Sequence, residues 1–206
     1  MDKFNSIGNQ YKAIVIGGSA GSFQVINKIL SSLPRDFELP IIMCLHRLRH
    51  VRNGFVEALN IKSNIEIKEP LDKESIKKNS IYLAPANYHL GVDIGNTFAL
   101  STDDLVNNSR PSIDILLQTA SYVYKHKLVG ILLSGANRDG ASGMQKIAER
   151  GGLTVIQDPK DCLIDTMPAS ALKLTTIDYS LNTDGIIEFL LALDKSIKSV
   201  ALLKNE

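Results

Sequence analysis

The sequence lacks the features of disulfide-rich, membrane-spanning and strongly charged proteins. It has two cysteines among 206 residues, and Cys44 and Cys162 form no C-x-x-C pair. Cys44 lies in an apolar run, which indicates a buried free thiol, and this cysteine usage is typical of a cytoplasmic protein. No apolar run approaches the roughly 20 residues of a transmembrane helix, so we expect no insertion into a membrane.

Charge balance and the start of the chain exclude two further classes. The 23 basic and 22 acidic residues give a net charge of +1, which argues against a nucleic-acid-binding protein. Residues 1–11 are polar and lack the apolar stretch of a secretion signal, so we expect a flexible lead-in there. The composition, 44% hydrophobic and 22% charged, is ordinary for globular proteins, and residues 12–206 are long enough for one domain.

Strand-like and helix-like patterns alternate along the chain. Apolar or alternating runs predict strands at 14–16, 40–45, 64–69, 81–85, 128–133 and 153–157, and Gly95-Asn96 joins 91–94 and 97–100 into a hairpin. Helices are predicted at 54–59, 141–150 and 168–173 and from 184 to near the end of the chain. The apolar stripe Phe23, Ile26, Leu30 and Leu33 predicts another helix. A further helix is predicted from Pro111 to Tyr124, because proline suits the first turn. The pattern predicts a doubly wound, mainly parallel α/β sheet with helices on both faces and an inserted antiparallel hairpin.

The stretch Gly17-Gly18-Ser19-Ala20-Gly21 fits G-x-S-x-G, the pattern of a nucleophile elbow. Glycines on both sides let the backbone turn sharply between strand and helix, so that the serine hydroxyl projects from the sheet edge. In such an elbow the backbone N–H of Ala20, the residue after the nucleophile, is the natural oxyanion donor, helped by the positive end of the helix that follows Gly21.

A base and an acid follow two other predicted strands. His46 ends the run at 40–45, and Asp139 lies in the glycine-rich loop after 128–133. Because the carboxyl ends of parallel strands share one edge, both residues can meet Ser19 there and form a Ser-His-Asp site.

Structural alternatives remain for each of these three residues. Ser19 is also compatible with a tight turn or a phosphate-binding loop, although the run from Gly17 lacks the third-position glycine of G-x-G-x-x-G. His46 taken alone is compatible with a structural histidine. Asp139, followed by Gly140-Ala141, is compatible with an N-cap of the next helix, a role that it can combine with catalysis.

Blocks of residues along most of the chain resemble the catalytic domain of the CheB-type chemotaxis protein-glutamate methylesterases. They are Ile16 to Gly21, Leu33-Pro34, Leu45-His46, Ile81 to Pro85 with His89-Leu90, Arg110 to Asp114, Ser134-Gly135 with Asp139-Gly140, Gly151-Gly152, Gln157 to Pro159, and Met167-Pro168. The resemblance implies a Ser19-His46-Asp139 triad that hydrolyses glutamyl methyl esters on methyl-accepting chemotaxis receptors and can deamidate receptor glutamines. It implies no metal or organic cofactor, and the cytoplasmic region of the receptors as the partner.

The resemblance also suggests residues around the triad. Gly21, His89 and Arg110 belong to matching blocks and are candidates to line the site, although a buried or surface histidine and a structural arginine are competing interpretations. A basic cluster, Arg47, Arg49 and Arg52, follows His46. It is compatible with a solvated loop or with docking of the glutamate-rich receptor helices.

Two departures from the family keep other functions open. Ala136 and Asn137 replace a methionine and a glycine that the family usually has before the aspartate. Together with the missing receiver domain, this altered loop motivates the alternative of a catalytically weak relative that acts as a signalling or binding module. The short lead-in leaves no room for the receiver domain that many family members carry, so we expect a stand-alone relative, with a separate response regulator as one possible partner, or an excised domain. A general α/β hydrolase is a third alternative, but that fold orders its residues Ser, Asp, His.

Overall fold

The computed structural model describes residue 4 and residues 8–46 and 54–203, with side chains up to residue 199. Seven parallel strands form one sheet in the order β3-β4-β2-β1-β7-β8-β9, and a separate antiparallel hairpin pairs β5 with β6. The strands of the sheet are β1 (Ala13–Gly18), β2 (Ile41–Leu45), β3 (Ile67–Lys68), β4 (Ile81–Leu83), β7 (Leu128–Leu132), β8 (Leu153–Gln157) and β9 (Tyr179–Leu181), and those of the hairpin are β5 (His89–Asp93) and β6 (Thr97–Ser101).

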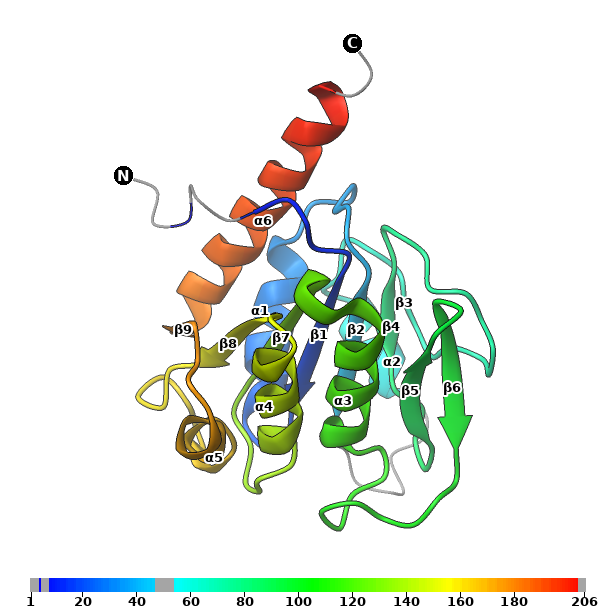
Figure 1. Cartoon of the computed structure of the whole chain (residues 1–206), viewed down its shortest axis with the longest axis vertical. Helices are drawn as coiled ribbons and strands as arrows, with labels where there is room; N and C mark the ends of the chain where they lie inside the picture. Colours follow the sequence, from blue (N-terminus) through cyan, green and yellow to red (C-terminus); the bar gives the residue numbers. More distant parts are fainter. Residues whose placement is uncertain (1–3, 5–7, 47–53, 204–206) are drawn as a thin grey trace.

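Helices cover both faces of the sheet (Figure 1). They are α1 (Ser22–Ser32), α2 (Phe55–Asn60), α3 (Ile113–Tyr124), α4 (Ala141–Glu149), α5 (Thr166–Leu174) and α6 (Thr183–Leu203), with a 3-10 turn at Lys125–Lys127. One hydrophobic core lies under α1, α2 and α6, and the other lies under α3, α4, α5 and the hairpin. The expected doubly wound fold with an inserted hairpin is therefore confirmed.

The alternation of side chains along β1 explains how one strand serves both cores. Ile14 and Ile16 belong to the core under α1 and α6, whereas Ala13 and Val15 belong to the core under α3 and α4. Successive residues of a strand point to opposite faces of the sheet, so an apolar residue is required at every position of a central strand.

Four local predictions needed correction. The strand expected at 64–69 is only Ile67–Lys68, and β9 was not predicted because Tyr179–Leu181 is too short to show a pattern. Pro111 precedes the N-cap of α3 instead of standing in its first turn. Phe23 is 36% exposed and packs against the ring of Phe55, because α1 turns Val25, Ile26, Ile29 and Leu30 toward the core.

In the part of the chain that the structure describes, no helix is both long and apolar enough to cross a membrane.

The close packing of α3 against α4 requires a glycine. A Cβ atom built on Gly143 would lie 2.4 Å from Cβ and 2.9 Å from Cδ1 of Leu117, a fully buried residue of α3. Those distances are shorter than any that real Cβ atoms show, so a side chain at residue 143 would force the two helices apart.

Gly143→Ala is therefore expected to destabilise the protein, although alanine is the better helix former by about 1 kcal/mol. We expect the free energy of unfolding to fall by about 1–3 kcal/mol because of overpacking. Urea unfolding measures it, with Gln145→Ala in the same helix as the control. An increase in stability for Gly143→Ala would contradict the close contact.

Candidate active site

The turn after β1 presents Ser19 at the carboxyl edge of the sheet. Gly21, the N-cap of α1, has a φ of 87°, and a Cβ atom there would lie 2.6 Å from Oγ of Ser134 and 2.7 Å from Cβ of Leu163. Glycine is thus required by the backbone and by the space around it. Ser134 holds the turn in place, since its Oγ donates to the carbonyl of Ala20 and its own carbonyl accepts the N–H of Ser19.

Strand register brings His46 beside Ser19. Gly18 of β1 pairs with Leu45 of β2, so the next residues, Ser19 and His46, leave neighbouring parallel strands at the same level. The N–H of His46 donates to the carbonyl of Gly18 over 3.0 Å, which continues the pairing one step past β2. Paired parallel strands lie about 5 Å apart, so the two side chains need only rotate to meet.

His46 is hydrogen-bonded to Asp139 at the end of the third strand. The Nε2 atom of His46 lies 2.8 Å from Oδ2 of Asp139, with the His46 side chain 13% exposed and the Asp139 side chain fully buried. Among the described residues, neither Nδ1 of His46 nor the hydroxyl of Ser19 has a hydrogen-bond partner. Because the other ring nitrogen is bound to Asp139, Nδ1 is the nitrogen available to accept a proton from Ser19.

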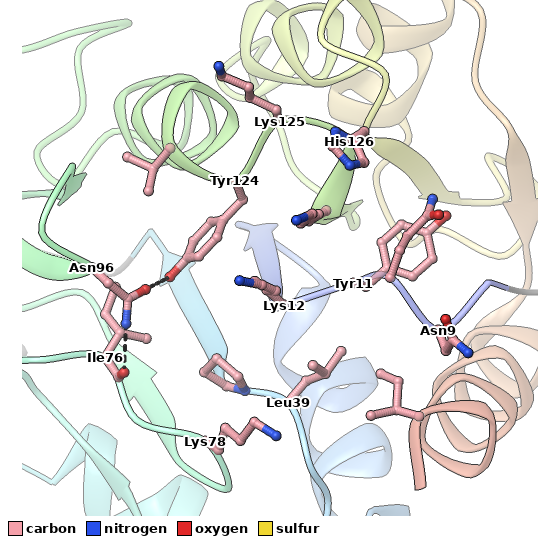
Figure 2. A pocket seen from close by; sticks show the side chains of 15 residues that line it. Asn9, Tyr11, Lys12, Leu39, Ile76, Lys78, Asn96, Tyr124, Lys125 and His126 are labelled. Atoms are coloured by element: carbon pink, nitrogen blue, oxygen red, sulfur yellow. Dashed lines mark hydrogen bonds between the residues drawn. The ribbon is translucent and has the colours of Figure 1, made fainter. Parts of the chain in front are cut away.

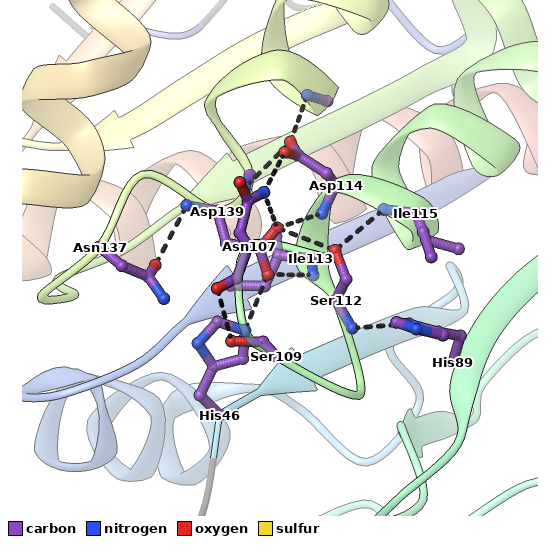
Figure 3. Close-up of polar contacts among 12 residues, drawn as sticks. His46, His89, Asn107, Ser109, Ser112, Ile113, Asp114, Ile115, Asn137 and Asp139 are labelled. Carbon is purple, nitrogen blue, oxygen red and sulfur yellow. Dashed lines mark hydrogen bonds and ion pairs between the residues drawn. The ribbon is translucent and has the colours of Figure 1, made fainter. Parts of the chain in front are cut away.

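Asp139 receives hydrogen bonds from several elements at once (Figure 3). Oδ2 accepts from His46 and, over 2.7 Å, from the N–H of Ile113. Oδ1 accepts from Oγ of Ser112 at 2.9 Å, from the N–H of Asp114 at 3.0 Å and from Nδ2 of Asn107 at 3.1 Å. These hydrogen bonds therefore fix the orientation of the Asp139 carboxylate.

These donors decide the charge state of Asp139. Burial by itself would raise the pKa of Asp139, but the hydrogen bonds from His46 and from the N–H groups of Ile113 and Asp114 outweigh it and hold the pKa below its ordinary value. A carboxylate that stays ionised beside His46 can hold one imidazole tautomer and stabilise the imidazolium, as the acid of a triad does.

Helices α3 and α4 exchange carboxylates at their amino-terminal ends. Asp139, just before α4, accepts the first two N–H groups of α3, those of Ile113 and Asp114. In return, Oδ1 of Asp114 in α3 accepts the N–H groups of Gly140 and Gly143 at the start of α4, over 3.0 and 2.7 Å. Each helix is thus capped by an acid of the other, which satisfies N–H groups that have no partner within their own helix.

Asp114 differs from Asp139 in the direction of its pKa shift. It is 6% exposed, and burial, together with the charge of Asp139, raises its pKa despite the hydrogen bonds that it accepts. The pKa of Asp139 is therefore shifted down and that of Asp114 is shifted up, so Asp139 loses its proton more easily than Asp114.

Comparison with known proteins assigns the family. A family model described as CheB methylesterase matches residues 14–190. The chain belongs to the CheB methylesterase family. Its members are hydrolases of chemotaxis, so the resemblance inferred from the motif blocks is confirmed.

Relatives and a solved structure agree on this family. A Leptospira interrogans protein is 46% identical over 186 residues, covering 90% of this chain and 96% of that protein. A Thermotoga maritima protein-glutamate methylesterase/protein-glutamine glutaminase is 33% identical over 189 residues, 88% of this chain but 54% of that longer protein. The crystal structure of the Thermotoga maritima CheB methylesterase catalytic domain has a TM-score of 0.84 at 32% identity, covering 89% of this chain and 98% of that chain.

Two residues from the CheB motif blocks already have partners within the fold. The ring of His89 is 1% exposed, with Nδ1 accepting from the N–H of Ser112 and Nε2 3.0 Å from the carbonyl of Asp104, so it supports the start of α3. Nη1 of Arg110 donates to the carbonyls of Thr102 and Asp103. For both residues a contact with substrate stays a prediction.

The loop that departs from the usual CheB pattern leads directly into Asp139. Ala136 is exposed, and Oδ1 of Asn137 accepts the N–H of Asp139 over 3.1 Å, so Asn137 supports the backbone of the acid. The predicted docking residues Arg47, Arg49 and Arg52 lie outside the described residues.

Sequence reasoning missed three residues that the fold brings to the site. Asn107 and Ser112 donate hydrogen bonds to Asp139, and the 80% exposed Leu163 lies against Gly21. The stretch around Asn107 reads only as a polar loop, and Leu163 belongs to no motif. The side-by-side pair Asn107-Asn108 was the available signal, because asparagine tolerates the left-handed conformation that both adopt.

A pocket lies at the opposite, amino-terminal edge of the sheet (Figure 2). It has a volume of about 840 Å³, and its lining includes Lys12, Lys78, Lys125 and Lys127 together with the ring of Tyr124, whose hydroxyl donates to Asn96. None of the predicted site residues lines it. Over residues 4, 8–46 and 54–203, no group of three or more His, Cys, Asp or Glu side chains is placed to hold a metal ion.

The lowered pKa of Asp139 predicts how stability depends on pH. A carboxyl whose pKa is lower in the folded state contributes stability above its unfolded pKa of about 3.9, and that contribution is lost as the pH falls through the folded value. Asp139→Asn is expected to unfold more easily at pH 7, by about 1–3 kcal/mol, and to lose less stability than the wild type between pH 5 and 2.5. Urea titrations at several pH values measure both effects, with the exposed Glu188→Gln expected to match wild-type stability at pH 7. Parallel pH curves for Asp139→Asn and the wild type would contradict the assignment.

Proposed function

We propose that this chain is a protein-glutamate methylesterase in which Ser19 is the nucleophile, His46 the base and Asp139 the acid of the triad. The observation that carries the proposal is the buried 2.8 Å contact between His46 and Asp139 at the strand end next to the Ser19 elbow. Relatives of the same family that share most of this chain are protein-glutamate methylesterases/protein-glutamine glutaminases.

Acyl transfer would begin with attack of Ser19 Oγ on the ester carbonyl while Nδ1 of His46 takes its proton. The imidazolium then gives that proton to the departing methoxy oxygen, the C–O bond breaks, and methanol leaves an acyl-serine. Water then attacks the acyl-serine while His46 takes one of its protons. The bond between the acyl carbon and Ser19 Oγ breaks, His46 returns the proton to that oxygen, and the carboxylic acid product loses its own proton to solvent to become the carboxylate. Deamidation of a glutamine follows the same steps with ammonia leaving in place of methanol.

The oxyanion of each tetrahedral intermediate needs a donor beside Ser19. The N–H of Ala20 suits this role because it has no hydrogen-bond partner among the described residues and stands at the start of α1. Charge that develops on the oxygen is further stabilised by the positive end of that helix.

We assign the cytoplasmic region of methyl-accepting chemotaxis receptors as the substrate and the cytoplasm as the site of action, with a separate response regulator as a regulatory partner. The family's role in chemotaxis supports this assignment. The alternative of a weak relative that serves as a binding module rested on Ala136 and Asn137. In the structure Asn137 accepts the N–H of Asp139, so the altered loop still supports the backbone that carries this residue.

The first experiment measures methanol release from methylated chemoreceptor cytoplasmic fragments by the wild type and Ser19→Ala. We expect the loss of the nucleophile to lower kcat by at least about 10³-fold. The exposed Ser31→Ala in α1 is the matched control and should keep wild-type activity. Release that persists in Ser19→Ala would reject the nucleophile, and no release from either protein with several receptors would favour the binding module.

A second experiment tests docking of the acidic receptor. Replacing Arg47, Arg49 and Arg52 with serine should lower turnover of the receptor about 10-fold or more at low salt, because electrostatic steering is lost, and should spare hydrolysis of a small ester.

The matched control for docking replaces three other cations, Lys12, Lys62 and Lys195, and should leave receptor turnover within about twofold of the wild type. Equal losses on the receptor and on the small ester would reject a docking role for the arginine cluster.

A further inference from the structure

One amide side chain joins the two buried acids of the site. Nδ2 of Asn107 donates one hydrogen bond to Oδ2 of Asp114 at 2.9 Å and another to Oδ1 of Asp139 at 3.1 Å (Figure 3). Both carboxyl groups are buried, and an NH₂ group has two hydrogens for them. Asn107 therefore uses its full donor capacity between two groups that would otherwise repel each other.

The backbone around Asn107 is built to deliver this amide. Asn107 and Asn108 have φ values of 51° and 60°, and Val106 and Ser109 exchange backbone hydrogen bonds across them, which defines a tight two-residue turn. Asn108 is exposed, and its side chain makes no hydrogen bond among the described residues. The same turn therefore carries one residue that reaches the acids and one that does not.

The remaining donors to each acid come from different parts of the site. Asp114 receives its others from the backbone at the start of α4, whereas Asp139 receives its others from His46 and from the start of α3. Asn107 thus lies outside both helices. Its amide binds Oδ1 of Asp139, whereas Oδ2 of Asp139 binds His46.

We propose that Asn107 is a positioning residue for the methylesterase reaction, acting through Asp139 on His46. This inference rests on the proposed function. The amide directs the carboxylate so that Oδ2 faces the imidazole, and it offsets the negative charge of Asp139 next to that of Asp114. The ionisable groups around it are Asp139 before α4, Asp114 in α3, His46 after β2, and His89 of β5, which lies behind Ser112.

Asn107→Gly tests the proposal because it removes the amide and keeps a residue that accepts a positive φ. We expect kcat for a small methyl ester to fall roughly 10- to 100-fold with little change in KM, since a misdirected acid affects the chemical step. The acidic limb of the kcat profile should shift to higher pH, because a less compensated Asp139 charge favours the protonated imidazole. Asn107→Asp should shift it further.

Asn108→Gly and Asn108→Asp are the matched controls, and both should keep wild-type kcat and pH profile. Urea unfolding of each variant supplies the folded fraction, so that kcat is stated per folded enzyme. A kcat for Asn107→Gly equal to that of Asn108→Gly would overturn the proposal. A lower kcat with an unchanged pH profile would also overturn it, since that result is what a purely structural turn predicts.

A double-mutant cycle tests whether Asn107 acts through Asp139. The variant Asn107→Gly/Asp139→Asn should be no slower than Asp139→Asn alone, because the amide then has no catalytic acid to direct. Multiplying losses would overturn the proposal. Full activity of Asp139→Asn would reject the triad itself, and this result separates failure of the proposed function from failure of the role of Asn107.

Discussion

The exchange of carboxylates between α3 and α4 is the interaction on which the site depends. Asp139 caps α3 and Asp114 caps α4, so neither helix can shift along its axis without breaking the cap of the other. A single cap contributes about 0.5–2 kcal/mol to stability, and here the cap on α3 also fixes the orientation of the Asp139 carboxylate. Gly143 permits the close approach of the two helices that makes this exchange possible.

Stability and catalysis therefore draw on the same hydrogen bonds. The hydrogen bonds from His46 and from the N–H groups at the start of α3 hold the pKa of Asp139 below its ordinary value although its side chain is fully buried, and this favours the ionised partner that a triad histidine requires. A helix N-cap and a triad acid were competing interpretations of Asp139 from sequence alone. In the structure Asp139 does not cap α4, the helix that follows it, whose N-cap is Gly140 without a side-chain hydrogen bond. It caps α3 instead, so the expected cap was assigned to the wrong helix, and the observed geometry is compatible with the proposed catalytic role.

The other half of the site depends on the parallel sheet. Register between β1 and β2 sets Ser19 beside His46, and Ser134, after β7, holds the turn that follows Ser19. Ser134 and Leu163 lie so close to the turn after Ser19 that a side chain at residue 21 would clash with them, so glycine is required there. Three consecutive strands of the sheet, β2, β1 and β7, thus supply the three residues of the proposed triad at one edge.

The sequence alone determined the α/β class, the hairpin, most helices and the three triad candidates, because periodicity and glycine-flanked strand ends are local signals. It did not determine the start of α3, the length of β3 or the existence of β9, where few residues carry the pattern. The sequence did not predict the other partners of Asp139, because Asn107, Ser112 and Asp114 are 25 to 32 residues away along the chain and no local pattern links them to it. Only tertiary packing decided them, because a buried carboxylate must be satisfied by whichever donors the fold brings near it.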